Sequence, residues 1–236
     1  MIITIDGPAG SGKSTMARSL AARLGVPYLD TGAMYRVVTL AALEDGLDLQ
    51  DDERLARLAG GDAYELEFGP TQVRVALRGR EVSEEIRSLR VSSHTHYVAA
   101  LPGVRAALVE RQRQIGRRLR HFVTEGRDQG SVAFPDADLK FFLDASLETR
   151  AARRLQDLQS EGDAVTLARV KENLRMRDET DSSRAVGPLR RPDGAICIDT
   201  SGMSVAQVLD CMLEHVARAG LTPPHQTGGT PEGSTP

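Results

Sequence analysis

Short apolar runs alternate with longer amphipathic segments along most of the chain. The runs that are short and apolar enough to be buried strands are 2–5, 26–30, 122–124, 139–143 and 195–198. Apolar side chains at helical spacing predict helices over 14–24, 33–44, 52–58, 104–119, 147–159, 167–179 and 204–217. Strands and helices in this order favour an α/β fold, with a mostly parallel five-stranded sheet between two layers of helices.

The segment 61–96 breaks this pattern. Tyr64–Phe68 and Val73–Leu77 each alternate apolar with polar side chains, which predicts an antiparallel hairpin, and Glu81-Val82 begins a third short strand. A helical pattern then runs over Glu84–Ala99. We therefore expect a small antiparallel insertion on one side of the parallel sheet.

A glycine-rich motif joins the first predicted strand to the first helix. Residues 7–14 read GPAGSGKS, which is the phosphate-binding P-loop pattern G-x-x-x-x-G-K-[ST]. In such a loop the backbone N–H groups point toward a polyphosphate, Lys13 contacts the β- and γ-phosphates, and the Ser14 hydroxyl binds Mg²⁺. The residues expected to bind the nucleoside triphosphate are Gly7, Pro8, Ala9, Gly10, Ser11, Gly12, Lys13, Ser14 and Thr15.

Polar and charged residues also follow the other predicted strands. Thr31 follows the second strand, where it is placed to cap the next helix, and Arg36 lies about one and a half turns into that helix. The third strand is followed by the sequence EGRDQG over 125–130. Because ligands of parallel sheets bind beyond the carboxyl ends of the strands, we expect these side chains to line a site.

Arginines and acids are concentrated in the second half of the chain. Arg150, Arg153 and Arg154 lie on one predicted helix, and arginines alternate with aspartates in the segment 177–184, RDETDSSR. Guanidinium groups bind phosphates as planar forks, while neighbouring acids hold the arginines in position and accept ribose hydroxyls. A solvated helix face and a surface cluster of ion pairs are the alternative interpretations.

Composition limits the partners that the chain can have. Its 236 residues are 40% hydrophobic and 27% charged with a net charge of -3, so the surface as a whole is not a nucleic-acid footprint. No apolar run approaches membrane-spanning length, and the two cysteines lack metal-ligand spacing. We expect a cytoplasmic monomer without a membrane or nucleic-acid partner, ending in a disordered tail over 221–236 that is rich in Pro, Gly, Ser and Thr.

P-loop proteins include switches, motors and phosphotransferases. A GTPase switch needs a base-reading Asn-Lys-x-Asp segment, and none of the three lysines lies in one. A motor needs an apolar strand that ends in adjacent acids, which 122–125 resembles only weakly. The second set of arginines and acids, with the inserted hairpin, instead indicates two phosphate-bearing ligands that face each other, as in a phosphotransferase.

Taken in order, these motifs resemble those of the bacterial cytidylate kinases, which are nucleoside monophosphate kinases. The resemblance covers about residues 2–218 and rests on IDGPAGSGKST (5–15), YLDTGAMYR (28–36), EVSEEIRS (81–88), VAALPGVRAAL (98–108), EGRDQGSVAFPDA (125–137), FFLDAS (141–146), RAARRLQDLQ (150–159) and RDETDSSRAVGPL (177–189). It implies phosphorylation of CMP and dCMP to CDP and dCDP by ATP, through direct in-line transfer in pyrimidine nucleotide metabolism, with Mg²⁺ as cofactor.

The resemblance also implies a domain organisation and a set of site residues. A P-loop NTPase-type core would comprise 1–60, 97–148 and 186–220, with a CMP-binding insertion over 61–96 and a helical lid over 149–185. The catalytic residues would be Lys13, Arg127, Arg154 and Arg177. The residues that would contact CMP are Arg36 and Arg127 at the phosphate, Arg105, Asp128 and Arg184 at the cytosine, Arg177 and Asp181 at the ribose, and also Thr31 and His96.

Three positions depart from the family pattern. His96 stands where serine is usual near the base amino group, Glu125 stands where aspartate is common, and Gln129 replaces a hydrophobic residue. The first of these departures bears on the selectivity for cytosine.

The implied acceptor needs no general base. A phosphate monoester has a second pKa of about 6, so CMP is largely dianionic at neutral pH, and alignment with charge neutralisation would suffice for transfer. Two alternatives stay open. One is a kinase for UMP or for a metabolite alcohol, the alcohol requiring Asp128 as base; the other is a nucleotide-dependent binding protein without phosphoryl transfer.

Overall fold

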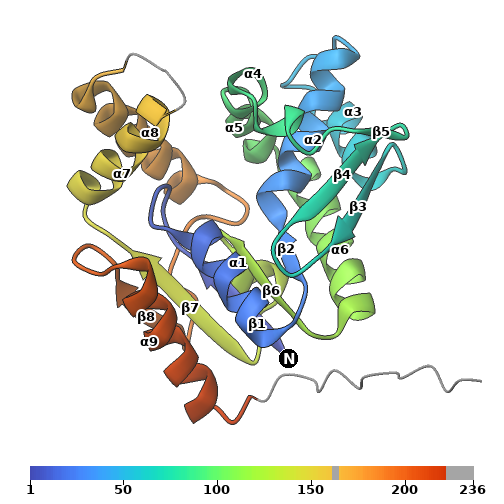
Figure 1. The fold of residues 1–236 in the computed structure, drawn as a ribbon. Helices are drawn as coiled ribbons and strands as arrows, with labels where there is room; N and C mark the ends of the chain where they lie inside the picture. Colours follow the sequence, from blue (N-terminus) through green and yellow to red (C-terminus); the bar gives the residue numbers. More distant parts are fainter. Residues whose placement is uncertain (161–164, 222–236) are drawn as a thin grey trace, which may run out of the picture.

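The computed structural model describes residues 1–160 and 165–221 and contains, within these ranges, a five-stranded and a three-stranded sheet (Figure 1). The larger sheet has the order β2-β6-β1-β7-β8 and consists of β1 (Ile2–Asp6), β2 (Tyr28–Asp30), β6 (Phe122–Gly126), β7 (Leu139–Asp144) and β8 (Ile196–Asp199). Every neighbouring pair is parallel, which confirms the predicted sheet. Because β6 and β7 flank β1 on opposite sides, the strand order reverses beside the P-loop, and open α/β sheets bind ligands at such a point.

Helices cover both faces of this sheet. On one face α1 (Lys13–Leu24) packs with α9 (Val205–Arg218). The opposite face is covered by α6 (Pro102–Leu119) and the π-helical turn η2 (Gln129–Ala133), and α3 (Asp52–Gly60) and α2 (Thr31–Glu44) pack against α6. The predicted three-layer α/β fold is therefore confirmed.

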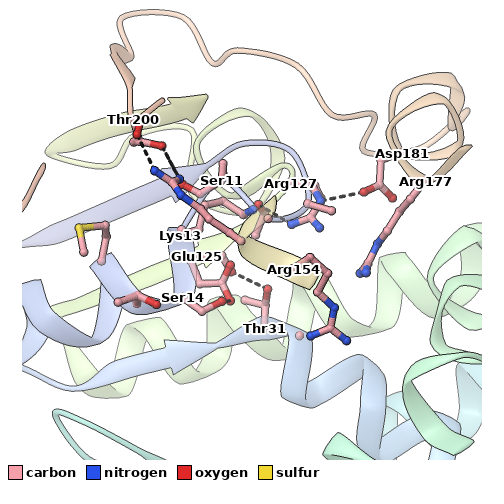
Figure 2. Close-up of a pocket in the computed structure, with 18 of the residues that line it drawn as sticks. Ser11, Lys13, Ser14, Thr31, Glu125, Arg127, Arg154, Arg177, Asp181 and Thr200 are labelled. Carbon is pink, nitrogen blue, oxygen red and sulfur yellow. Dashed lines mark hydrogen bonds and ion pairs between the residues drawn. The ribbon is translucent and has the colours of Figure 1, made fainter. Parts of the chain in front are cut away.

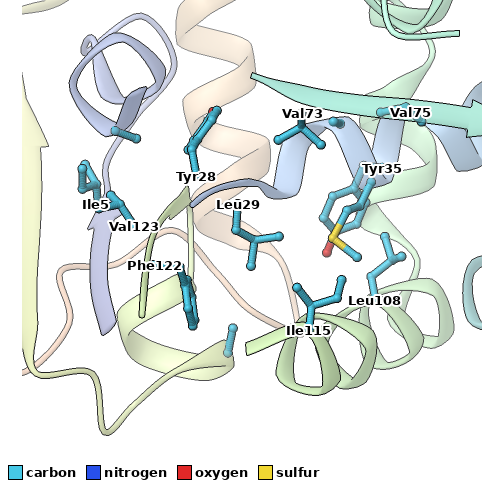
Figure 3. Close-up of a cluster of buried hydrophobic side chains, with 14 of the residues drawn as sticks. Ile5, Tyr28, Leu29, Tyr35, Val73, Val75, Leu108, Ile115, Phe122 and Val123 are labelled. Atoms are coloured by element: carbon cyan, nitrogen blue, oxygen red, sulfur yellow. The ribbon is translucent and has the colours of Figure 1, made fainter. Parts of the chain in front are cut away.

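The central strands are apolar because both of their faces are buried. Ile5, Phe122 and Val123 have no exposed surface (Figure 3), and the Phe122 ring packs edge-on against Phe134 with 5.1 Å between centroids. Burial of one such side chain stabilises the fold by about 1.5–3 kcal/mol. This core holds the carboxyl ends of the strands, where the polar residues singled out above are found, in fixed positions.

The insertion forms its own antiparallel sheet. Its strands are β3 (Tyr64–Phe68), β4 (Val73–Leu77) and β5 (Arg80–Glu81), and their pairing confirms the predicted hairpin. The Tyr28 N–H of β2 donates to the carbonyl oxygen of Gly69 in the hairpin turn at 2.9 Å. The hairpin is thus bonded to the edge of the large sheet.

The helical pattern predicted over 84–99 does not form one continuous helix. The structure has instead a 3₁₀ turn, η1 (Glu85–Arg87), followed by the short helices α4 (Leu89–Ser92) and α5 (Thr95–Ala100). Ser88 Oγ accepts a hydrogen bond from Val91 N, and Ser92 Oγ donates to Arg87 O. Serine side chains that bond nearby backbone groups in this way compete with helical hydrogen bonding, and we attribute the breaks to them.

A pair of helices from the second half of the chain lies beside the P-loop (Figure 1). These are α7 (Leu147–Ser160) and α8 (Leu167–Ser183), and their apolar cluster of Ala151, Val170 and Leu174 also contains Ala9 of the P-loop.

The sequence also predicted that the chain has no membrane span and that it ends in a disordered tail. No helix among the described residues is long and apolar enough to cross a membrane. Leu221 packs against the core, and the rest of the predicted disordered tail, 222–236, lies outside the described residues.

Candidate active site

The P-loop follows β1 and turns through three glycines with positive φ. Gly7, Gly10 and Gly12 have φ values of +150°, +78° and +90°, which other residues rarely adopt. A Cβ on Gly7 would also lie 2.0 Å from the carbonyl oxygen of Leu143 in β7. The neighbouring strand therefore leaves no room for any side chain at this position.

Lys13 lies across the inside of the loop (Figure 2). Its Nζ donates to Pro8 O at 2.6 Å, and its side chain is buried. Burial, together with the positive charge of Arg127, lowers the pKa of Lys13 to about 7. A bound triphosphate would raise this pKa again, because its anionic oxygens favour the ammonium form.

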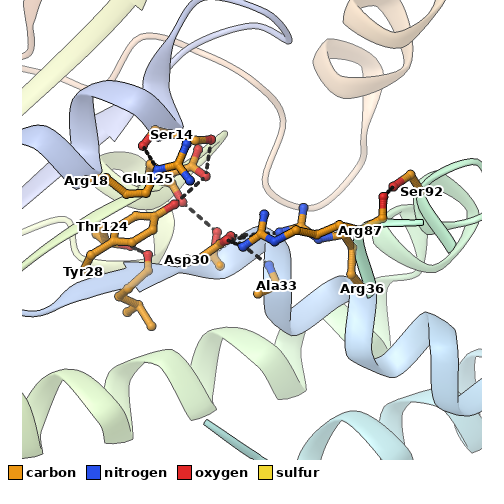
Figure 4. A network of polar contacts seen from close by, with 12 residues as sticks. Ser14, Arg18, Tyr28, Asp30, Ala33, Arg36, Arg87, Ser92, Thr124 and Glu125 are labelled. Carbon is orange, nitrogen blue, oxygen red and sulfur yellow. Dashed lines mark hydrogen bonds and ion pairs between the residues drawn. The ribbon is translucent and has the colours of Figure 1, made fainter. Parts of the chain in front are cut away.

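Ser14, in the first turn of α1, faces the end of β6. Its Oγ donates to Glu125 Oε1 at 2.9 Å, and the Tyr28 hydroxyl donates to the same oxygen at 3.4 Å (Figure 4). Within the described residues, no group of three or more His, Cys, Asp or Glu side chains could hold a metal ion by itself. A hydroxyl and a carboxylate are oxygen ligands of the kind that Mg²⁺ takes together with substrate phosphates and water. Ser14 and Glu125 are thus the residues that fit this ion.

A buried carboxylate at the end of β2 organises the start of α2. Asp30 Oδ1 accepts from Ala33 N at 2.8 Å and so caps the helix. The prediction that Thr31 caps α2 is therefore wrong. Thr31 is the first residue of the helix, and its Oγ1 donates to the carbonyl oxygen of Glu125 at 2.7 Å.

Asp30 also binds two arginines from different parts of the chain (Figure 4). Arg36 NH2 donates to its two oxygens at 3.2 and 3.1 Å, and Arg87 NH2 of η1 donates to Oδ2 at 3.2 Å. Although burial raises the pKa of Asp30, the two guanidinium groups outweigh it and hold that pKa below its ordinary value. An ionised Asp30 therefore fixes Arg36 at the wall of the cavity described below.

Arg105 and Asp128 form a buried ion pair. Arg105 NH1 also donates to Ala99 O at 3.0 Å, and the guanidinium carbon lies 5.6 Å from the centre of the Tyr35 ring. Gly187 packs directly over the pair. A Cβ at this position would lie 2.2 Å from Asp128 Oδ2 and 2.5 Å from Arg105 NH2, so no side chain fits there. The pair is enclosed from several sides and has little freedom to move.

Asp181 of α8 is bonded to the loop that follows β6 (Figure 2). Arg127 Nε donates to Asp181 Oδ2 at 2.7 Å, and Arg184 pairs with the other carboxylate oxygen. Although burial raises the pKa of Asp181, these two cations hold it below its ordinary value.

Arg177, one turn before Asp181, has no hydrogen-bond or ion-pair partner among the described residues. Neighbouring residues that displace water from the guanidinium group, and next the charge of Arg127, lower its pKa to about 10. The side chain is exposed to the cavity, and a guanidinium group without a partner among the described residues favours the binding of an anion.

Asp6, the last residue of β1, fixes the segment that contains Arg127 and Asp128. Its two carboxylate oxygens accept from Gln129 N at 2.8 Å and from Gly130 N at 2.7 Å, and burial raises the pKa of Asp6 to about 6. The sequence reasoning missed this residue. Its place at the carboxyl end of a strand, directly before the P-loop, was the available signal.

A cavity of about 680 Å³ connects these groups. Of the predicted site residues, those that line it are Ala9, Gly10, Ser11, Gly12, Lys13, Ser14, Thr15, Thr31, Arg36, Arg105, Arg127, Asp128, Arg154, Arg177, Asp181 and Arg184. Gly7, Pro8 and His96 do not line it. His96 is exposed, with its ring centroid 3.9 Å from that of Tyr97, and the neighbouring Thr95 lines the cavity.

The cavity also extends to residues that the sequence reasoning did not assign. Thr200 and Met203 line it from the loop between β8 and α9, Val205 lines it from the start of α9, and Arg153 NH2 donates to Thr200 O at 2.6 Å. This loop follows the carboxyl end of a strand, as the Arg127 segment does. It was missed because it has no charged side chain between Thr200 and Val205.

Comparisons with known proteins match nearly the whole chain. The family model described as Cytidylate kinase matches residues 3–218. A cytidylate kinase from Caldanaerobacter subterraneus subsp. tengcongensis is 44% identical over 216 residues, which cover 92% of this chain and 94% of that protein. A bifunctional pantoate ligase/cytidylate kinase from Synechococcus sp. (strain JA-3-3Ab) is 49% identical over 89% of this chain, and the chain spans 39% of the length of that relative.

Among solved structures, that of an uncharacterized protein from Eubacterium ventriosum matches with a TM-score of 0.53 at 14% identity. The match covers 92% of this chain and 98% of the other. At this level of identity the likeness concerns the fold alone, and it agrees with the layered α/β architecture.

Proposed function

This chain belongs to the cytidylate kinase family, and we propose that it transfers the γ-phosphoryl group of ATP to CMP and dCMP, releasing ADP with CDP or dCDP. The observation that supports this most is the shared cavity, which is lined both by Lys13 of the P-loop and by the Arg127–Asp181 pair. A triphosphate in the loop and a monophosphate on the arginines would face each other, as in-line transfer requires.

The donor site would neutralise the triphosphate before transfer. Backbone N–H groups of the P-loop and the Lys13 ammonium group would bind the β- and γ-phosphates. Ser14 and Glu125 would hold Mg²⁺, which when bound offsets phosphate charge. Arg154 and Arg177 both line the cavity, and their guanidinium groups would meet the transferring phosphoryl group (Figure 2).

Repulsion between the phosphates of the two nucleotides explains why the site needs several cations. Two unit negative charges 4 Å apart repel each other by about 4 kcal/mol at an effective dielectric constant of 20. Lys13, Arg127 and Arg177 would offset this repulsion as the two nucleotides approach.

The acceptor site would distinguish the parts of CMP. We assign the phosphate to Arg36 and Arg127, the cytosine to Arg105, Asp128 and Arg184, and the ribose to Arg177 and Asp181. A dianionic phosphate needs no base, and Asp128 is already engaged by Arg105 in a buried ion pair. This pairing favours a phosphate acceptor over an alcohol, since an alcohol would need a carboxylate free to take its proton.

The proposal also covers the domain organisation of the chain, its oligomeric state and its location in the cell. The core would comprise 1–60, 97–148 and 186–220, the CMP-binding insertion 61–96, and the lid 149–185. The chain would act as a monomer in the cytoplasm, within pyrimidine nucleotide metabolism, without a nucleic-acid or membrane partner.

A panel of acceptors tests the proposed function. The full chain is incubated with Mg²⁺ and ATP and with each of CMP, dCMP, UMP, AMP and GMP, and both products are quantified. The proposal predicts equal amounts of ADP and of CDP or dCDP with the two cytidine nucleotides, and little turnover with the others. ADP formation that does not depend on a nucleoside monophosphate would reject it.

A further inference from the structure

Two arginines of α7 attach this helix to the P-loop. Arg150 NH1 donates to the carbonyl oxygen of Ala9 at 3.0 Å. About one turn later, Arg153 binds Thr200, whose hydroxyl donates to the carbonyl oxygen of Ser11 at 3.4 Å. The start of α7 is therefore bonded, directly and through Thr200, to two carbonyl groups of the loop.

Arg150 also pairs with α8. Its NH1, the nitrogen that donates to Ala9, lies 2.6 Å from Asp178 Oδ2. Asp178 belongs to the turn of α8 that presents Arg177 and Asp181 to the cavity. We call this chain of contacts the Ala9–Arg150–Asp178 bridge, and it connects the P-loop backbone to the helix on the acceptor side.

The bridge is surrounded by tight packing. Arg150 is only 6% exposed, and a Cβ on Gly10 would lie 3.2 Å from Arg150 Cβ. Ala9 itself belongs to the apolar cluster of the lid helices. Because close-packed side chains transmit displacement, a change in the P-loop backbone moves α7 and α8 with it.

Arg150 does not line the cavity, so it acts through other residues. Its charge compensates Asp178, whose Oδ1 is buried without a hydrogen-bond partner among the described residues. Removal of Arg150 would leave a partly buried carboxylate beside Arg177, in a region that must accept phosphates.

We propose that Arg150 and Asp178 are positioning residues that couple the donor site to the acceptor site. A triphosphate that orders the P-loop also holds α8, through the Ala9–Arg150–Asp178 bridge, with Arg177 and Asp181 turned toward the monophosphate. The inference rests on the proposed function. Since coupling between two binding sites is reciprocal, CMP raises the affinity for the donor by the same factor.

Calorimetric titration of the full chain measures this coupling. The dissociation constant of CMP is determined alone and with saturating Mg²⁺ and a non-hydrolysable ATP analogue. In the unaltered protein we expect the analogue to tighten CMP binding by about fivefold or more. Arg150→Met and Asp178→Asn should each reduce this factor to about one. Asp178→Asn, which leaves no uncompensated carboxylate, should do so while CMP binding in the absence of the analogue changes by less than about threefold.

Two further variants separate coupling from general damage. Arg150→Met combined with Asp178→Asn should have no larger effect than either change alone, because both break the same bridge. Arg175→Met is the matched control: it removes an exposed arginine that pairs with Glu172 and Glu179 on α8, away from the P-loop. This control should keep the coupling factor of the unaltered protein.

Several outcomes would overturn the inference. The first is a coupling factor of one in the unaltered protein. The second is an unchanged coupling factor in Arg150→Met and Asp178→Asn, and the third is additivity of the two substitutions in their effects on the coupling factor. If Arg150→Met does not fold, the test rests on Asp178→Asn alone. The Asp178 side chain is 22% exposed, so its substitution should not prevent folding. Turnover of CMP by the unaltered protein, measured in parallel, keeps the two proposals apart: activity with unchanged coupling rejects only the bridge, and absence of activity rejects the proposed function.

Discussion

Ser14 Oγ lies 2.9 Å from Glu125 Oε1, so the P-loop hydroxyl and the carboxylate at the end of β6 meet at one wall of the cavity. These residues are 111 positions apart in sequence, and the parallel pairing of β1 with β6 brings them together. In the proposed function, the hydroxyl and the carboxylate would hold Mg²⁺ beside the phosphates of the donor.

Glu125→Gln keeps the shape of this side chain and removes its charge. A neutral amide is a weaker ligand for Mg²⁺ than a carboxylate, so we expect the Mg²⁺ concentration at half-maximal rate to rise by about tenfold, equivalent to about 1.4 kcal/mol. Titration with Mg²⁺ at saturating ATP and CMP measures it. Glu148→Gln, which changes an exposed acid on α7, is the control; an unchanged Mg²⁺ requirement in Glu125→Gln would show that Glu125 does not act on the ion.

Donor binding should take up a proton. The pKa of Lys13 is lowered to about 7 in the ligand-free protein, so at pH 8 most Lys13 side chains are neutral. The triphosphate binds the ammonium form and raises that pKa, so about one proton should be taken up at pH 8, and affinity should fall by up to about tenfold per pH unit above 7. Calorimetry in buffers of different ionisation enthalpy measures the uptake. Lys13→Met should abolish it; equal uptake in that variant would assign the proton to another group.

Arg127→Lys separates charge from geometry on the acceptor side. Lysine keeps the positive charge but cannot bind both Asp181 and a phosphate as a planar fork does. We expect the KM for CMP to rise by about tenfold or more, with the KM for ATP changed far less. Steady-state kinetics with each substrate varied in turn measures this. Arg117→Lys on the exposed face of α6 should leave both constants unchanged, and a larger change in the KM for ATP than for CMP would contradict the assignment.

Gly187→Ala tests the enclosure of the Arg105–Asp128 pair. The new methyl group would lie 2.2 Å from Asp128 Oδ2, so the pair must shift, and we expect the KM for CMP to rise by about tenfold. Gly194→Ala is a matched control, because Gly194 has a similar φ of +73° and no atom within 4 Å of the added Cβ. Backbone strain is common to both variants, so equal effects on CMP kinetics would show that strain, and not displacement of the pair, is responsible.

The local features of this chain were predictable from its sequence. The glycine spacing of the P-loop and the apolar strands determine local structure directly, and the helix predicted over 14–24 ends at Gly25, which adopts the left-handed conformation. The helix predicted over 204–217 likewise begins with a capping box, in which Ser204 and Gln207 bond each other's backbone.

Pairings between distant side chains were not predictable in the same way. Asp30 is the last residue of the predicted strand 26–30, but its bonds to Arg36 and Arg87 depend on how the insertion packs against α2. The helical periodicity over 84–99 likewise did not predict that serines break the segment. Periodicity reflects only which side chains are buried, and not whether serine side chains compete for backbone hydrogen bonds.

The most direct test of the central claim follows one phosphoryl group. In a single turnover with limiting ATP labelled at its γ-phosphate and excess CMP, the label should appear in CDP at its β-phosphate, without prior release as inorganic phosphate. Label found only in inorganic phosphate, or transferred to UMP or an alcohol while CMP stays unlabelled, would contradict the account.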